Sequence, residues 1–209
     1  AQTYLDDFLA GSVETGEIGG LGWSFTNGSI TKLNGIQAHP GVVRHTGSAT
    51  ANQVVSFYLG NAVGDTQFRF DEFAEAIFVF KEAAAAQTDM TLQIGVLTAF
   101  GNVVVTHGCY LEIKPADSNY FVVCRNGSTE TRIDTTIARG TNWTKLQIRR
   151  IGAAEVRFNI NGGADLTITT NVPDAVDSLG VGKQSAQTGT TARNIDIDWI
   201  SFKLLAIAR

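Results

Sequence analysis

Cysteine, histidine and clustered basic residues are scarce in this sequence. Its two cysteines, Cys109 and Cys124, are too few for a disulfide-rich scaffold and do not have zinc-site spacing. The three histidines, His39, His45 and His107, are not three or four residues apart, which argues against a zinc motif. Sixteen basic residues face twenty acidic ones without a Lys/Arg cluster, so we expect no nucleic-acid partner. No apolar run approaches the roughly 20 residues of a membrane-spanning helix, so we expect no membrane insertion.

Glycine and apolar residues are abundant by comparison. The chain has 209 residues, of which 22 are glycine, 3 are proline and 44% are hydrophobic, a composition typical of a turn-rich β protein. The length and the absence of a linker or repeat predict one domain, residues 1–209. The N-terminal Ala1-Gln2-Thr3 lacks the basic and apolar regions of a signal peptide, which favours synthesis as a cytoplasmic product.

Short β-branched and aromatic segments recur between Gly, Asn and Asp clusters, and this spacing predicts an antiparallel β-sandwich or jelly roll with little or no helix. The predicted strands are Val54–Leu59, Thr91–Leu97, Tyr110–Ile113, Tyr120–Cys124, Leu146–Ile151 and Val156–Ile160. Apolar and polar residues alternate strictly through Val156–Ile160, which indicates a strand with one buried face. Asn161-Gly162 is a strong hairpin signal, and Ala164–Thr170 supplies the return strand.

Two segments allow sharper expectations. A turn between Ala116 and Asp117 would place Cys109 opposite Cys124 on paired strands, and we favour buried free thiols over a disulfide. Asp71–Ala86 is rich in helix formers but contains a β-branched and aromatic run. We therefore expect a long strand through Lys81 and a single helical turn at Glu82–Ala86.

Acidic residues suggest two enzyme-like constellations. Asp196 and Asp198 share one face of a predicted strand, and paired carboxylates are typical of glycosidases. We favour the alternative that they form the outward polar face of a closing C-terminal strand. Glu72 and Glu75 form a second acidic group near Asp71, which we interpret as solvated charge.

One metal site and one ligand site are candidates. Asp6 and Asp7 lie in the first predicted strand, which in jelly rolls often neighbours the last, so a calcium ion between Asp6 or Asp7 and Asp198 is chemically reasonable. His39 and Arg44, on the bend and strand around His39-Pro40-Gly41, are candidate ligand-binding residues.

Three tryptophans are candidate platforms for sugar rings. Trp23 lies in a Gly-rich loop, and we expect it to be the platform if there is one. For Trp143 and Trp199, at the edges of apolar strands, core or rim packing is favoured.

Two parts of the chain resemble known families. The last 70 or so residues resemble the back half of concanavalin A-like lectin/glucanase jelly rolls, through segments 142–148, 156–162, 170–173 and 196–199. The front resembles structural proteins of tailed bacteriophages, through its DDF, GxLGW and HPG elements at 6–8, 19–23 and 39–41. The sandwich glucanases carry glutamates where this chain has Asn194 and Asp198, which argues against their catalysis.

The second resemblance implies a non-enzymatic structural protein of a phage particle, made in the host cytoplasm. It implies a homotrimeric capsid decoration or cement protein whose partners are the major capsid or tail protein. A tail or fibre module that binds a host-surface glycan is the alternative, and a glycan-active hydrolase or lyase that uses the acidic strand residues is a second one. Fold alone does not decide among them.

Overall fold

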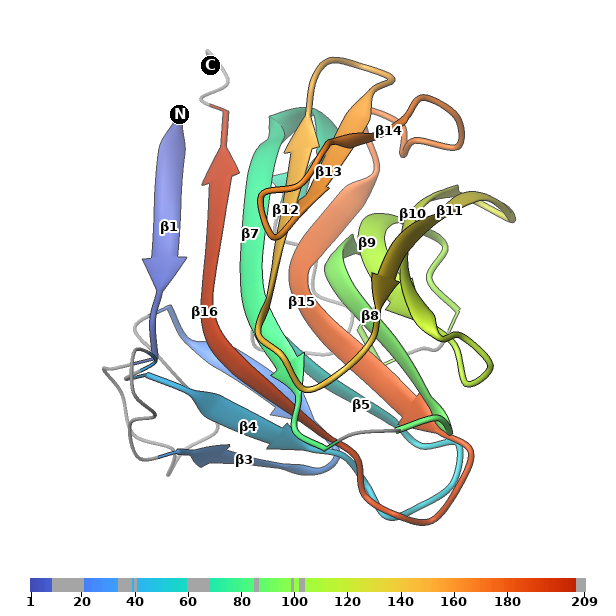
Figure 1. Ribbon diagram of the computed structural model, residues 1–209. Coiled ribbons are helices and arrows are strands. Elements are labelled where there is room, and N and C mark those ends of the chain that lie inside the picture. Colours follow the sequence, from blue (N-terminus) through green and yellow to red (C-terminus); the bar gives the residue numbers. More distant parts are fainter. Residues whose placement is uncertain are drawn as a thin grey trace.

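The computed structural model describes residues 1–8, 21–33, 39, 41–59, 68–84, 87–98, 100–101 and 104–205. Here the chain forms two antiparallel sheets of eight strands each, packed face to face (Figure 1). This confirms the predicted all-β sandwich. No helix in the described ranges has the length and apolarity needed to cross a membrane. Gly19, Gly20 and Pro40, which contribute to the quoted phage-like segments, lie outside the described residues.

The first sheet, called sheet A, contains both ends of the described chain. In spatial order it comprises β14 (Leu166–Ile168), β13 (Val156–Ile160), β12 (Thr144–Arg150), β7 (Phe73–Glu82), β16 (Asn194–Leu204), β4 (Val43–Thr46) and β3 (Ser29–Lys32). The first strand, β1 (Gln2–Asp6), pairs with the far end of β16, so the first and last strands are neighbours as predicted.

The second sheet, called sheet B, contains the predicted cysteine hairpin. In spatial order it comprises β11 (Thr129–Ala138), β10 (Asn119–Asn126), β9 (His107–Ile113), β8 (Met90–Leu97), β15 (Ser178–Gln187), β5 (Val54–Leu59) and β2 (Trp23–Thr26), with β6 (Phe68–Arg69) beside β15. Cys109 lies opposite Cys124, as predicted, and both are buried free thiols with their Sγ atoms 3.3 Å apart.

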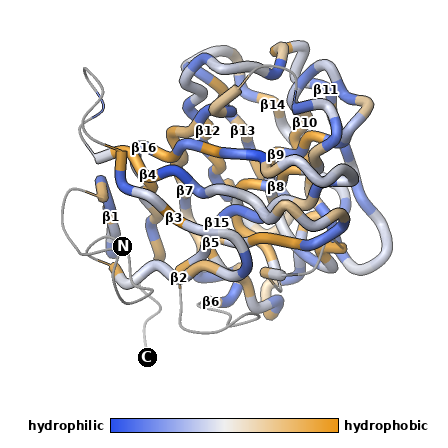
Figure 2. Tube along the Cα trace, turned by 90° about the horizontal axis from the view of Figure 1, so that it is seen from below, coloured by the Kyte–Doolittle hydropathy of each residue, from blue (hydrophilic) through white to orange (hydrophobic). Residues whose placement is uncertain are grey.

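The core lies between the sheets because apolar and polar residues alternate along many strands, a pattern visible in Figure 2. In β16, Ile195 and Ile197 point into the core while Asp196 points to the outer face. The predicted hairpin is also present, since Asn161 and Gly162 have positive φ angles of 54° and 76° between β13 and β14. Full burial of each large apolar side chain contributes about 1.5–3 kcal/mol.

The segment after Arg69 differs in part from its prediction. The strand ends at Glu82, but it begins at Phe73, because Phe70–Glu72 forms a 3-10 turn, η2. Glu72 stabilises this turn by accepting a hydrogen bond from the Arg69 backbone N–H at 2.8 Å. At the other end Glu82 belongs to the strand, and Ala83 continues the pairing by donating its N–H to the Asn194 carbonyl. The predicted turn at Glu82–Ala86 therefore does not begin at Glu82, and residues 85–86 lie outside the described ranges.

Two polar contacts connect the sheets through buried surroundings. Lys183 of β15 is fully buried, and its Nζ lies 2.9 Å from His45 Nδ1 of β4 and 2.8 Å from Ser185 Oγ. Arg139, just after β11, donates to both carboxylate oxygens of Glu82 at 3.1 and 2.6 Å. Such groups are stable in a core only when they are paired.

Candidate functional site

Four of the candidate residues come together on the outer face of sheet A. His39 Nδ1 lies 2.6 Å from Asp198 Oδ2, and Arg44 donates to both oxygens of Asp196 at 2.7 and 2.9 Å. The hydrogen bonds with Asp196 raise the pKa of Arg44 above its ordinary value. Lys81 Nζ lies 3.9 Å from the same carboxylate. These side chains therefore form a charge-paired cluster across β4, β16 and β7.

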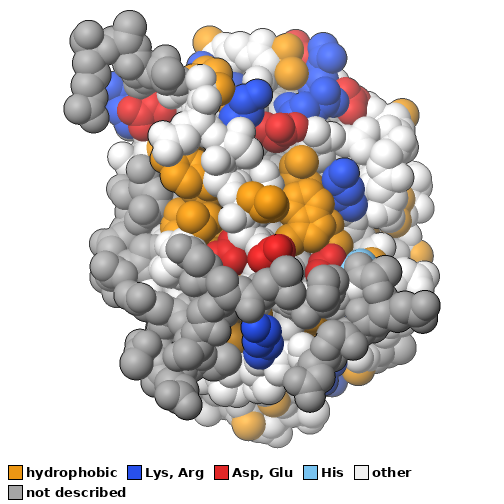
Figure 3. Space-filling view, turned by 90° about the vertical axis from the view of Figure 1, so that its left-hand side faces the viewer, with side chains coloured by type: hydrophobic (Ala, Val, Ile, Leu, Met, Phe, Trp, Pro, Cys, Tyr) orange, Lys and Arg blue, Asp and Glu red, His pale blue; other side chains and the backbone are white. Residues whose placement is uncertain are grey.

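Two half-buried tryptophans, Trp143 and Trp199, lie beside this cluster. The Trp143 ring stacks on His39 with the ring centroids 4.2 Å apart, and Lys81 Nζ lies 4.8 Å from the Trp143 ring. Lys145 Nζ lies 5.9 Å from the centroid of the Trp199 ring. Figure 3 shows this face, where apolar side chains gather near its middle and acidic and basic side chains lie around them. Both tryptophans are half-buried, as rim packing predicts.

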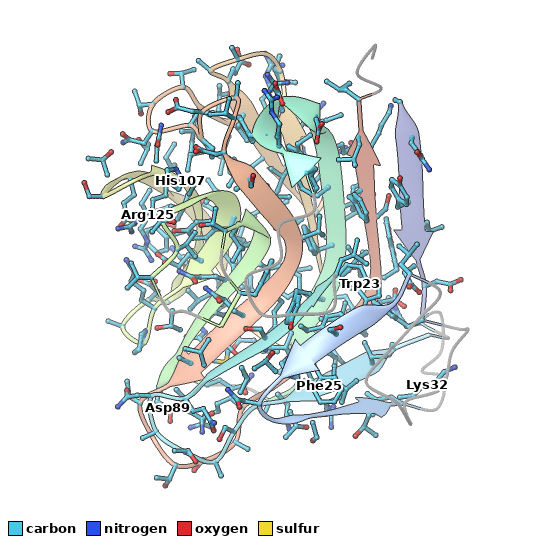
Figure 4. The ribbon with its side chains drawn as sticks, turned by 180° about the vertical axis from the view of Figure 1, so that it is seen from behind. Trp23, Phe25, Lys32, Asp89, His107 and Arg125 are labelled. Atoms are coloured by element: carbon cyan, nitrogen blue, oxygen red, sulfur yellow. The ribbon has the colours of Figure 1, made fainter. Side chains whose placement is uncertain are left out.

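Trp23 is not a sugar platform, contrary to the prediction. Its side chain is fully buried, and it stacks on Phe57 with ring centroids 5.1 Å apart. Its indole N–H donates to Asp6 Oδ2 at 3.0 Å. The reason is that Trp23 opens β2 and points into the sandwich, as Figure 4 shows, instead of remaining in a loop.

The predicted calcium site is not formed either. Asp6 lies opposite the buried Ile200 and accepts hydrogen bonds from the N–H groups of Phe8, Leu21 and Trp23. Asp198 is instead paired with His39, and Asp7 is exposed. Among the described residues no group of three acidic, His or Cys side chains could hold a metal ion. Asp6 is thus a buried acceptor that connects β1 to Trp23.

The two acidic pairs do not form an exposed acid and base. Both oxygens of Asp196 are held by Arg44, and Asp198 has His39 as its partner. Glu72 caps η2, and Glu75 accepts a hydrogen bond from Gln147, so this second pair serves two separate local contacts.

A pocket that the sequence did not predict lies on the outer face of sheet B. It has a volume of about 330 Å³, within the range of small-molecule sites. Polar side chains from three strands line it together with an apolar rim. The lining residues are Thr91, Gln93, Val104, Val105, Glu112, Lys114, Pro115 and Arg125.

The floor of this pocket is a row of hydrogen-bonded side chains. The Gln184 amide donates to Gln93 Oε1 at 2.7 Å, and Gln93 donates to Glu112 Oε1 at 3.0 Å. Arg132 donates to Glu112 Oε2 at 2.9 Å from the other side. The Gly101 N–H donates to Gln184 Oε1 at 3.1 Å, which connects the β8–β9 loop to the row. Glu112 is thereby held in a fixed position.

Basic side chains stand closer to the mouth. Lys114 Nζ lies 3.2 Å from Glu112 and 3.6 Å from Glu130, and its side chain is 45% exposed, so it is available to a ligand. Arg125 donates to Glu130 at 2.6 Å. Figure 4 shows Arg125 near His107, and the register agrees, since Asn126 is opposite His107. His107 Nδ1 lies 3.0 Å from Asp177, outside the pocket.

An aromatic cluster supports the loop beside the pocket. Phe100 stacks on Tyr58 with ring centroids 5.3 Å apart, and Tyr110 packs in the same buried group. Burial raises the pKa of Tyr110 above its ordinary value. Gly182 makes room for this packing, because an added Cβ would lie 2.9 Å from the Phe100 ring. Val105, which reaches the pocket from this loop, belongs to the same buried group and is therefore held by packing.

The sequence contained a weak signal for this pocket. Side chains alternate along a strand, so a buried Cys109 places Leu111 and Ile113 on its own face and Glu112 on the opposite one. A single carboxylate in an otherwise apolar strand is a candidate for a polar site. Gln93 and Arg132 could not be added to it, because their strand pairing is not visible in the sequence.

Comparisons with known proteins support the fold. SO2946 of Shewanella oneidensis MR-1, a protein of unknown function, has a TM-score of 0.68 and 20% identity, with 99% of this chain and 90% of that chain covered. The carbohydrate esterase vb_24B_21 of bacteriophage phi24B has a TM-score of 0.56 and 20% identity, covering 98% and 97%. A lichenase from a mouse hindgut metagenome has a TM-score of 0.61 and 9% identity, with 98% of this chain and 100% of that chain covered.

These likenesses confirm the jelly-roll fold of the lectin and glucanase type. No curated protein sequence matches the chain. Residues 38–198 match the family described as SO2946-like, C-terminal domain. That match extends over most of the chain. It includes the pocket lined by Glu112, called the Glu112 pocket, and the charged cluster around His39 on sheet A, called the His39 cluster. The chain therefore belongs to the SO2946-like C-terminal domain family.

Proposed function

We propose that this domain binds glycans in the Glu112 pocket without transforming them. The observation that carries the proposal is the hydrogen-bonded pair of Gln93 and Glu112, which lines the pocket and is held in a fixed position by Gln184 on one side and Arg132 on the other. Sugar hydroxyls both donate and accept, so a prearranged polar row suits them. The names of several structural neighbours indicate that they recognise or cleave carbohydrates, among them a carbohydrate recognition domain and a lichenase.

The walls of the pocket suit the other side of a sugar ring. Val104 and Pro115 form an apolar rim next to Glu112 and Lys114, whereas Val105 is buried. A pyranose ring has C–H groups on its faces and hydroxyls around its edge. It can therefore contact the rim with a face while its hydroxyls reach the polar floor.

The charge pairing supports binding over hydrolysis. A glycosidase needs one carboxyl group kept protonated by apolar surroundings and a second one nearby. Glu112 and Glu130 both contact Lys114, but each also has an arginine partner, Arg132 or Arg125. Neither carboxylate lies in the cation-free environment that the acid of a glycosidase requires.

Lys114→Ala is expected to weaken glycan binding about tenfold, because a hydrogen bond from a charged group contributes roughly 1.5–3 kcal/mol. Lys145→Ala is the matched control, since Lys145 is an exposed lysine on the outer face of sheet A. Isothermal titration with the best ligand from a glycan array measures both variants. Loss of binding in Lys145→Ala alone would move the site to the Trp199 face, and an array without any bound glycan would refute the proposal.

We further propose that the domain acts on a phage particle, as a glycan-binding tail or fibre module in preference to a head decoration protein. The front-half resemblance and the phi24B neighbour support this placement, and a binding pocket suits a receptor-binding part better than a cement protein. Light scattering is expected to show a homotrimer, and antibodies to the domain are expected to label tails of source virions. Labelling of heads would favour decoration, and a monomer absent from virions would refute the placement.

A further inference from the structure

We infer that the Glu112 pocket selects uncharged saccharides and discriminates against those that carry a carboxylate. This inference rests on the proposed glycan-binding function and names the ligand class of the same site. It follows from the way in which charges alternate around the pocket.

Six charged side chains form one continuous chain of ion pairs. Along this chain of ion pairs the residues follow one another in the order Arg125, Glu130, Lys114, Glu112, Arg132 and Asp117. The first four contacts have distances of 2.6 to 3.6 Å between the nitrogen and the carboxylate oxygen. These six side chains comprise three cations and three carboxylates, so their net charge is zero.

An anionic sugar gains little from such a chain. To contact Lys114 or Arg125, its carboxylate would have to approach Glu112 or Glu130 or displace one of them, and like charges at short distance repel. Selectivity can arise from this repulsion as much as from attraction.

A hydroxyl group can join the chain without disturbing its balance. Glu112 Oε1 accepts a hydrogen bond from Gln93, and a carboxylate oxygen can accept a second one. The Lys114 ammonium has three N–H groups and contacts two carboxylates, which leaves one to donate. One sugar hydroxyl between them would donate to Glu112 and accept from Lys114. The apolar rim provides no further charge.

The test uses matched glycan pairs: lactose with sialyllactose, and the methyl ester of an oligogalacturonate with its free acid. Titration at low and at high NaCl is expected to show binding of neutral members that salt hardly changes, and binding of the acidic partners that is about tenfold weaker. Tighter binding of the acidic members, declining with salt, would overturn this inference and leave glycan binding intact. Binding of neither member, together with a glycan array on which nothing is bound, would overturn the proposed function itself.

Glu130→Gln tests the charge balance directly. The change removes one carboxylate next to Arg125 and Lys114 while preserving size, and Glu130 is 28% exposed, so the fold is expected to tolerate it. The variant is expected to bind the acidic members about threefold to tenfold more tightly, relative to their neutral partners, than the wild type does. Glu155→Gln, which removes the exposed partner of Arg157, is the matched control. An unchanged preference in Glu130→Gln would overturn the inference.

Discussion

Raising the pH from about 6 to 9 is expected to stabilise this domain, because the ammonium group of the buried Lys183 is paired with His45 and Ser185, neither of which carries a carboxylate. Burial lowers the pKa of Lys183 to about 7, whereas the lysine of an unfolded chain has a pKa near 10.4. Between these values the unfolded state binds more protons, so the free energy of unfolding rises with pH, by up to about 1.4 kcal/mol per pH unit.

The neighbouring histidine extends this trend to lower pH. Burial, and then the charge of Lys183, lower the pKa of His45 well below its ordinary value. Below the unfolded pKa of about 6.5, the unfolded state takes up a proton that the folded state does not, so stability falls further as the pH falls. Both groups therefore act in the same direction.

Lys183→Met is expected to remove most of the pH dependence above pH 7. The variant should be more stable than the wild type near pH 6, because the methionine needs no desolvated charge. Near pH 9 it should lose this advantage, because Lys183 of the folded wild type is then neutral, whereas the variant still lacks the contacts of the lysine with His45 and Ser185, at a cost of about 1–3 kcal/mol. Urea unfolding across the pH range measures the effect, with Lys145→Met as the exposed control. A wild-type slope in Lys183→Met would show that the lysine is not the responsible group.

Arg139→Met is expected to lower the free energy of unfolding by about 3–5 kcal/mol and the Tm by on the order of 10 °C. The side chains of Arg139 and Glu82 are only 8% and 1% exposed. Arg139 also donates to the Gln87 carbonyl at 2.8 Å, so it connects three segments. Its removal would leave the Glu82 carboxylate buried without its cation, which is the costly part.

Two comparisons distinguish this explanation from a general loss of packing. Arg157→Met removes an exposed pair with Glu155 and is expected to change stability by less than about 1 kcal/mol. The double variant Arg139→Met/Glu82→Met is expected to be more stable than Arg139→Met alone, because it no longer buries an unpaired charge. Thermal unfolding measures all three, and a double variant less stable than the single one would contradict the ion-pair explanation.

Local parts of the fold were predictable because neighbouring residues determine them. The alternation in Val156–Ile160 and the positive φ tolerance of Asn161-Gly162 specify a hairpin without reference to the rest of the chain. The Cys109–Cys124 register followed from the turn position in the same way. Contacts within one hairpin join residues that are close in the sequence, so their register follows directly from the position of the turn.

The site was less predictable because its contacts cross the fold. His39 and Asp198 are 159 residues apart, yet they are paired. Trp23 looked exposed because it follows glycines, but Asp6 and Phe57 hold it in the core. The strands that line the Glu112 pocket follow one another in the chain, but Gln184, which donates to Gln93, comes from β15, whose place beside β8 is not visible in the sequence. Periodicity shows which face a residue occupies and does not show which residues stand beside it.

The pairing of β1 with β16 has a consequence for how the domain can be attached to other molecules. Gln2 lies opposite Leu204, so the two ends of the described chain are adjacent in sheet A, as Figure 1 shows. The Glu112 pocket lies on the outer face of the other sheet. A surface or fusion partner linked through either end would therefore hold the domain at one place, and the pocket would remain accessible from the opposite side.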